Sequence, residues 1–108
     1  MLALTRADRT AFEASAATTL LRALANERRL VILCQLGEGE MSVGALQAAL
    51  GLSQSALSQH LALLREEGIL ATRRQSQTIF YRIADPAAVK VIATLASIFC
   101  PPNAGETA

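Results

Sequence analysis

The chain is poor in the residue types that most often carry chemistry. Its 108 residues include no tryptophan, one tyrosine, one histidine and two cysteines. A nucleophilic hydrolase needs a histidine and an acid around its nucleophile, and a dithiol reductase or peroxidase needs an acidified cysteine, often in a Cys-x-x-Cys pair. His60 stands alone, and Cys34 is far from Cys100 in the sequence. We therefore expect a protein that is not an enzyme and that has neither catalytic residues nor a cofactor.

Long apolar runs are absent as well. Residues 1–8 lack the apolar core of a secretion signal, and the most apolar stretch, Val89–Cys100, is shorter than the ~20 residues that span a bilayer. The sequence thus predicts a cytoplasmic protein without a membrane partner. A chain of 108 residues with 52% hydrophobic residues is typical of one compact domain. We place this domain at residues 1–102 and a disordered tail at residues 103–108.

Strong overall positive charge, which is common in proteins that bind nucleic acids, is also lacking, because the net charge is only +1. The positive charge is concentrated locally instead. Residues 68–84 contain three arginines and no acidic residue. Since arginine suits bidentate contacts with phosphate and guanine, a basic patch remains available for a nucleic-acid partner.

Residues 52–61 read Leu-Ser-Gln-Ser-Ala-Leu-Ser-Gln-His-Leu and predict a helix with two different faces. Ser53 is suited to cap this helix at its N-terminus. Leu57, Leu61 and Leu64, at spacings of four and three, would bury one face. The opposite face would carry uncharged side chains that both donate and accept hydrogen bonds, as reading base edges in a major groove requires. We therefore predict a recognition helix with the DNA-binding residues Ser53, Gln54, Ser55, Ser58 and Gln59.

The flanking segments predict a helix-turn-helix followed by a hairpin. Ser42 can cap a short helix that ends at Gly51, where glycine favours the left-handed conformation. Gly68 would end the recognition helix, and strand patterns follow at residues 69–73 and 79–83. This order is that of a winged helix-turn-helix, a mostly α fold with about five helices and a two-stranded wing.

The tip of the wing is predicted at residues 73–77. Because arginine and glutamine there can reach phosphates or a minor groove, we expect Arg73, Arg74 and Gln77 to contact DNA. Ser76 stands at the tip, where the turn geometry cannot be inferred from the sequence.

The two ends of the chain predict a dimer. An N-terminal helix is expected from roughly Asp8 to Leu24, and a last helix is expected to be capped by Asp85 and ended by Pro101. The last helix carries several large apolar side chains: Val89, Val91, Ile92, Leu95, Ile98 and Phe99. One small domain cannot cover this surface, so we expect a homodimer formed through the N-terminal and C-terminal helices. An interaction module that does not bind DNA would also explain the last helix, but would leave the Ser/Gln face without a purpose.

The two cysteines allow more than one interpretation. Cys34 lies within an apolar helix and, taken alone, is typical of a small buried packing residue. Cys100 lies at the last turn of the final helix, directly before two prolines, where a packing residue could equally be leucine or alanine. Because a structural disulfide is not expected in a reducing cytosol, redox sensing, metal binding and coincidence remain open.

From Leu24 to Ile83 the chain resembles the arsenical-resistance-regulator family of small bacterial repressors. The resemblance is carried by Ala-Leu-Ala-Asn-Glu-Arg-Arg-Leu, by the recognition-helix segment and by Ile-Phe-Tyr-Arg. It implies a homodimeric repressor that leaves an inverted-repeat operator when an effector binds. The chain is most similar to the sulfide-responsive and biofilm growth-associated members, and in the sulfide-responsive members a persulfide or polysulfide links two thiols. Cys34 and Cys100 match those positions, which implies a redox-sensing pair for reactive sulfur species.

A metal-responsive or metalloid-responsive repressor of the same family is the alternative. Ser42 and Gly44 stand where metal-sensing relatives often have cysteines, and residues 89–99 contain no histidine or acid, so we assign no metal ligands. His60 with the two thiols could still make an incomplete site for arsenite or copper(I). Our structural interpretation of His60 is an imidazole that is hydrogen-bonded beneath the recognition helix.

Overall fold

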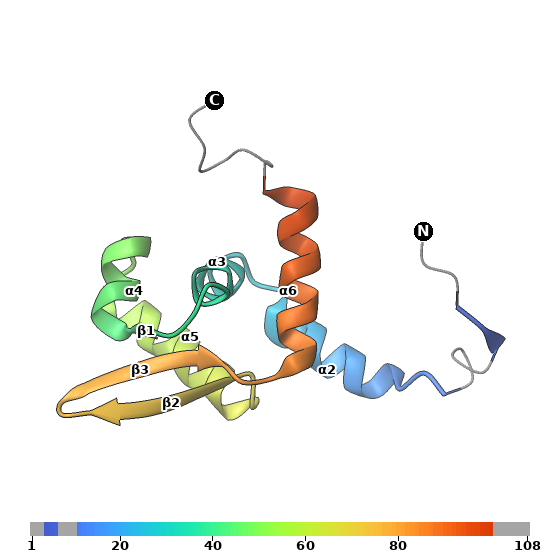
Figure 1. Cartoon of the computed structure of the whole chain (residues 1–108), viewed down its shortest axis with the longest axis horizontal. Coiled ribbons are helices and arrows are strands. Elements are labelled where there is room, and N and C mark those ends of the chain that lie inside the picture. The colour runs from blue at the N-terminus through green and yellow to red at the C-terminus, as the bar shows by residue number, and fades with distance from the viewer. Residues whose placement is uncertain (1–3, 7–10, 101–108) are drawn as a thin grey trace.

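The computed structural model describes residues 4–6 and 11–100. Five helices lie within Ala14–Phe99, together with three strands (Figure 1). In chain order the elements are α2 (Ala14–Leu24), α3 (Glu27–Leu36), β1 (Met41–Ser42), α4 (Val43–Leu50), α5 (Gln54–Glu66), β2 (Leu70–Gln75), β3 (Thr78–Ile83) and α6 (Pro86–Phe99). This order confirms the predicted mostly α fold with a β-hairpin. The predicted tail at residues 103–108 lies outside the described residues.

Local capping sets most of the helix ends. Ser42, Ser53 and Asp85 accept hydrogen bonds from the backbone N–H groups of Ala45, Ala56 and Ala87, which confirms the predicted helix starts. Gly51 and Gly68 have φ angles of 66° and 78°. Because glycine adopts this left-handed region without steric cost, these two residues end α4 and α5 as predicted.

The start of α2 differs from the prediction. Within the described residues this helix begins at Ala14, and Asp8 lies outside them. The N–H of Ala14 donates to the carbonyl of Phe12 at 3.1 Å, which is a tight three-residue turn. That turn withdraws the carbonyl of Phe12 from the helical pattern, so residues 11–13 do not extend the helix.

The core lies between α3, α4, α5 and one side of the sheet. The predicted leucine stripe of α5 is buried, which confirms its orientation: Leu57, Leu61 and Leu64 are 0–2% exposed. Ile32, Leu33 and Leu46 are fully buried against this stripe. From α6, by contrast, only Ala88 and Ile92 are buried, so most of this helix stays outside the core.

The sheet has three antiparallel strands in the order β1-β3-β2, rather than the predicted two. The two residues of β1 pair with Tyr81 and Phe80, and a strand this short leaves no periodic pattern in the sequence. Gln75 pairs with Thr78, so the turn between β2 and β3 consists of Ser76 and Gln77. The predicted tip was therefore too long, because Arg73 and Arg74 belong to β2.

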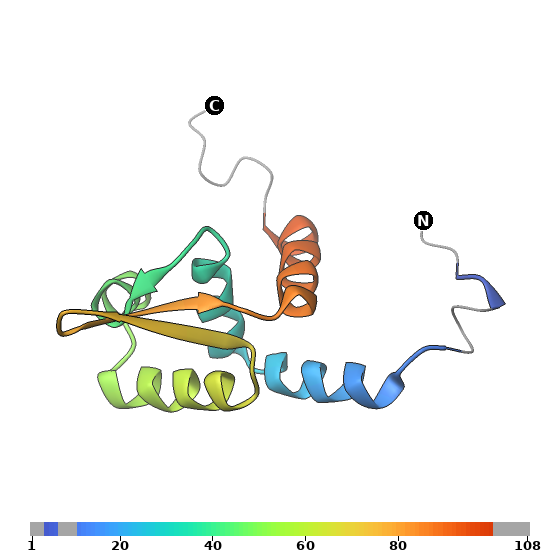
Figure 2. The ribbon, with the colours of Figure 1, turned by 60° about the horizontal axis from the view of Figure 1, so that its bottom comes forward.

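The hairpin of β2 and β3 forms an arm whose tip points away from α6 (Figure 2). Ser76 at this tip has a φ of 56°, a left-handed conformation that a turn of two residues between antiparallel strands favours. No helix of the described residues is long and apolar enough to cross a bilayer.

Candidate nucleic-acid interface and thiol cleft

The outward face of α5 carries the predicted recognition residues. Gln54, Ser55, Ser58 and Gln59 are all exposed, because the leucine stripe holds the opposite face in the core. The side chains of Gln54, Ser58 and Gln59 make no hydrogen bond with any residue that the structure describes. Three donor–acceptor side chains on one helix face are therefore available to an external partner.

Ser53 differs from these residues, because its hydroxyl oxygen is already used. It accepts the N–H of Ala56 at 3.2 Å and lies 3.5 Å from the hydroxyl of Ser55. Ser53 therefore caps α5, and any contact it makes with DNA must use the remaining capacity of the same hydroxyl group.

The two wing arginines lie in different surroundings. Arg73 donates from Nε to both carboxylate oxygens of Glu40 at 2.8 Å, and its Nη2 lies 2.7 Å from Glu40 Oε1. Its Nη1 donates to the side-chain oxygen of Gln75 at 2.9 Å. Arg74 has no ion pair with any described residue, and successive side chains of a strand point to opposite faces. Of the two arginines, only Arg74 presents an unoccupied guanidinium.

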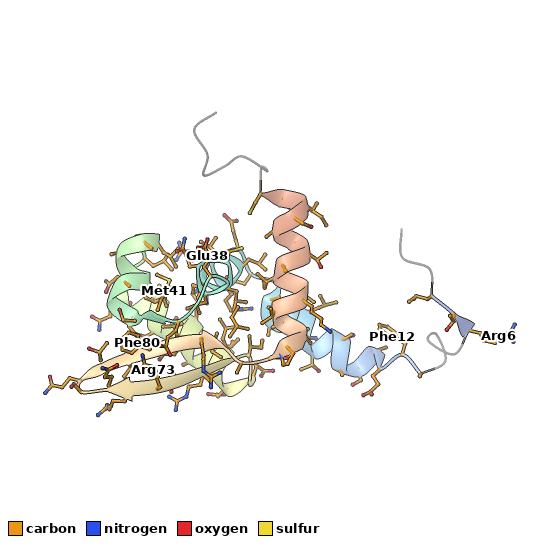
Figure 3. All side chains as sticks on the ribbon, in the orientation of Figure 1. Arg6, Phe12, Glu38, Met41, Arg73 and Phe80 are labelled. Carbon is orange, nitrogen blue, oxygen red and sulfur yellow. The ribbon has the colours of Figure 1, made fainter. Side chains whose placement is uncertain are left out.

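Phe80 contacts the guanidinium of Arg73 in addition to Glu40 and Gln75. The two residues are directly opposite each other in the β2–β3 register, and the guanidinium carbon lies 4.5 Å from the ring centroid of Phe80. This is a cation–π contact across the strands. In Figure 3, Arg73 and Phe80 lie on the hairpin, with Met41 of β1 nearby. The bonds to Glu40 and Gln75 and this contact together fix the direction of the Arg73 side chain.

Cys34 and Cys100 line one cleft of about 650 Å³. Cys34 lies in the last turn of α3, and Cys100 directly follows α6. The cleft is bounded by these two helix ends, by the connection at residues 37–40 and by β3, and its apolar wall includes Val89, Ile92 and Ala96. The fold thus brings together the two cysteines that the sequence analysis singled out.

Both cysteines are free thiols and both are exposed. The interpretation of Cys34 as a buried packing residue is therefore wrong: α3 buries Ile32, Leu33 and Leu36, and Cys34 lies on another side of the helix. Partial burial raises the pKa of the Cys34 thiol above its ordinary value, and the nearby Cys100 raises it further. Cys34 is thus kept protonated to a greater degree than a free cysteine, and its charge state is linked to that of Cys100.

His60 does not join the thiols. It is half-buried on α5, where partial burial lowers the pKa of the imidazole and the charges of Arg29 and Arg28 lower it further. It makes no hydrogen bond with any described residue, so the predicted buried hydrogen bond is wrong. No group of three potential metal-ligating side chains occurs among residues 4–6 and 11–100. The described residues therefore offer no ligand cluster that includes His60.

Two structural contacts were missed by the sequence analysis. Arg29 donates to the carbonyl oxygens of Ala23 at 2.6 Å and Arg22 at 3.3 Å and so stabilises the end of α2. The backbone N–H of Arg29 donates to Oδ1 of Asn26. Asparagine directly before a helix is a capping signal, so the sequence alone could have predicted this bond. The contact between Glu40 and Arg73 has no local signal, because it depends on the pairing of β1 with β3.

Comparisons with known proteins agree with the winged-helix fold. A family model described as bacterial regulatory protein, arsR family, matches residues 26–72. The chain is similar to the transcriptional activator HlyU of Vibrio cholerae, at 51% identity over 87 residues and 81% of both chains. It is also similar to the biofilm growth-associated repressor of Agrobacterium fabrum, at 49% identity over 78% of this chain and 72% of the relative. The structure of reduced HlyU from Vibrio cholerae covers 87% of this chain and 99% of its own, with a TM-score of 0.81 and 46% identity.

Proposed function

Because this chain belongs to the arsR family of bacterial regulatory proteins and is a DNA-binding transcriptional regulator, we propose that it is a homodimeric repressor that senses reactive sulfur species. Its sensor is the pair of thiols Cys34 and Cys100. The reduced protein binds its operator, and a sulfur bridge between the two thiols releases it.

The exposed face of α5 supports the recognition role. In a helix-turn-helix dimer, the two recognition helices enter successive major grooves of an inverted repeat, about one helical turn or a multiple of it apart. Gln54 and Gln59 carry the longest unoccupied polar side chains of this face and are suited to bidentate contacts with adenine. Base reading is assigned to them, and Ser55 and Ser58 add shorter contacts.

The observation that carries the sensing role is the shared cleft. Two cysteines that are far apart in the sequence line one cavity, and the pKa of Cys34 responds to Cys100. A raised pKa makes Cys34 a poor target for general oxidants, since the thiolate is the reactive form. Because the attack on a persulfide also needs a thiolate, the raised pKa slows that step as well, and it is the position of both thiols in one cleft that favours a bridge. One of the similar solved structures is that of reduced HlyU from Vibrio cholerae, a name that specifies a redox state for that protein.

The chemistry balances with a persulfide as the oxidant. One thiolate attacks the terminal sulfur of a persulfide, takes up that sulfur and releases a thiol. For a bridge with one added sulfur, two persulfide molecules and the two cysteine thiols give a trisulfide, two free thiols and one hydrogen sulfide. The terminal persulfide sulfur that leaves as hydrogen sulfide accepts the two electrons. A reductant reverses the bridge.

The energetic requirement for the switch is modest. A bridge joins the end of α3 to the end of α6, which carries the large exposed apolar surface assigned to the dimer interface. Moving α6 changes the distance between the two recognition helices without any contact with DNA. A ~100-fold loss of operator affinity needs a coupling of about 2.7 kcal/mol, within the usual range for allostery.

Single serine variants test this mechanism. Cys34→Ser and Cys100→Ser should each bind the operator as the wild type does, and each should fail to release it after persulfide treatment. The measurement is an operator-binding titration before and after treatment, with intact mass on the same samples. The wild type should gain sulfur mass that a reductant removes. Ser97→Ala, an exposed substitution in the same last turns of α6, is the matched control and should respond as the wild type does.

Release of DNA by either single serine variant would show that a bridge between the two thiols is not required. Release by stoichiometric arsenite or copper(I), with no response to persulfide, would establish the metal alternative instead.

A further inference from the structure

Glu40 contacts both the thiol cleft and the wing. It lines the thiol cleft together with Cys34 and Cys100, on the connection that leads from α3 to β1. Its carboxylate also receives the guanidinium of Arg73, on strand β2 of the wing. Strand β3 lines the cleft itself through Arg82 and Ile83, and the ion pair adds a direct link from the cleft wall to strand β2 of the hairpin.

The connection that carries Glu40, residues 37–40, is short and is held by backbone hydrogen bonds. The N–H of Gly37 donates to the carbonyl of Cys34 at 3.2 Å, and the N–H of Gly39 donates to that of Leu36 at 3.1 Å. Directly after Glu40, Met41 is paired with Tyr81 of β3. A displacement of the end of α3 by a bridge at Cys34 is thus passed to Glu40 within a few residues.

Arg73 is also well placed to receive such a displacement. Its guanidinium is held by Glu40, by Gln75 and by the ring of Phe80, whereas Arg74 in the next position has none of these contacts. The hydrogen bond from Arg73 lowers the pKa of the Glu40 carboxyl, so the acid stays ionised and the pair stays intact at neutral pH.

We propose that Arg73 is a positioning residue of the wing and not a phosphate ligand, and that the Glu40–Arg73 ion pair transmits the state of the thiol cleft to the wing. The transmitting step rests on the proposed sensing by Cys34 and Cys100. In this proposal Arg74, and not Arg73, is the wing residue that binds a phosphate.

A comparison of neighbouring arginines tests this assignment. Operator affinity is measured as a function of salt, in the reduced protein and after bridging of the thiols, for Arg73→Ala, Arg74→Ala and Glu40→Gln. Arg74→Ala should weaken both states alike and reduce the salt slope by about one unit. Arg73→Ala should leave the salt slope unchanged and lower the ratio of the two affinities about tenfold, equal to about 1.4 kcal/mol of coupling.

The double variant with Glu40→Gln and Arg73→Ala tests whether the two residues transmit the signal together or act independently. If the ion pair transmits the signal, Glu40→Gln lowers the ratio as Arg73→Ala does, and combining the two substitutions lowers it no further. A loss of salt slope in Arg73→Ala with an unchanged affinity ratio, as expected for Arg74→Ala, would overturn the proposal.

Bridging the thiols with dibromobimane separates this inference from the sulfur-sensing proposal. The reagent alkylates both thiols with loss of two bromides and applies a cross-link without any sulfur donor. If it lowers operator affinity in the wild type and lowers it about tenfold less in Arg73→Ala and Glu40→Gln, the transmission stands even where persulfide has no effect. If the bridged wild type keeps full operator affinity, the transmission is refuted.

Discussion

At the scale of single residues, the surroundings of Cys34 set how fast this thiol reacts. Partial burial and the neighbouring Cys100 both raise its pKa, so protonation is favoured over a wider pH range. Because only the thiolate attacks iodoacetamide, the alkylation rate of Cys34 should keep rising with pH beyond the ordinary cysteine value of about 8.5. Peptide-resolved mass spectrometry at a series of pH values measures this midpoint.

The variant Cys100→Ser supplies the control for this pH profile. It removes the charge that raises the pKa of Cys34 but leaves the burial of that thiol in place. The alkylation midpoint of Cys34 should therefore move down towards the ordinary value without reaching it. A wild-type midpoint at or below that value would contradict the environment described here.

At the scale of elements, α5 should behave as a helix with one face for the core and one for DNA. Gln54→Ala or Gln59→Ala should each cost ~1 to 3 kcal/mol of operator binding if the residue makes a bidentate base contact. Neither substitution should change the free energy of unfolding by much, since both side chains are exposed. Gln35→Ala, which removes an exposed glutamine from α3, is the matched control and should bind normally. Unchanged affinity and sequence preference in both α5 variants would show that another element reads the bases.

The elements that the sequence predicted well are those that local signals define. Ser42, Ser53 and Asp85 cap helices through bonds to residues two or three positions ahead, and Gly51 and Gly68 end helices by their own conformation. Such signals depend on neighbouring residues alone. The pattern of α5 was also readable, because polar residues interrupt its leucines and so mark which face is buried.

The rest depended on contacts between distant segments. The run Leu30–Cys34 is apolar at every position, so periodicity could not show that Cys34 faces outwards. The strand β1 and the ion pair of Glu40 with Arg73 arise only when residues 41–42 join the edge of the hairpin. Resemblance to a family suggested that the two cysteines belong together, but their shared cleft needed the folded chain.

At the scale of the whole molecule, α6 leaves large apolar side chains exposed in the single chain. Ile98 and Phe99 are 63% and 76% exposed, and Leu21 of α2 is 55% exposed. Both helices lie on the side of the molecule away from the tip of the hairpin (Figure 1). Exposed apolar side chains of this size are typical of a surface that is covered by a partner, and a second copy of the chain is the partner that we propose.

Charge placed in this surface should separate the copies. Ile98→Asp and Phe99→Asp should each shift the protein to a monomer in sedimentation experiments and weaken operator binding, because one recognition helix contacts only a half-site. Ala48→Asp, at an exposed position of α4, is the control and should remain a dimer. A dimer that persists in both α6 variants would place the interface elsewhere.

The outward face of α5 and the thiol cleft have no residue in common. Substitutions on one can therefore accumulate without disturbing the packing of the other. With α5 as the proposed reading face and the cleft as the proposed sensor, one copy of a duplicated gene would acquire a new target promoter through a few changes at positions 54–59 and keep its stimulus. Alternatively, it would retain the promoter and respond to a new stimulus. The same separation makes the chain a suitable scaffold for synthetic circuits, in which input and output are chosen independently.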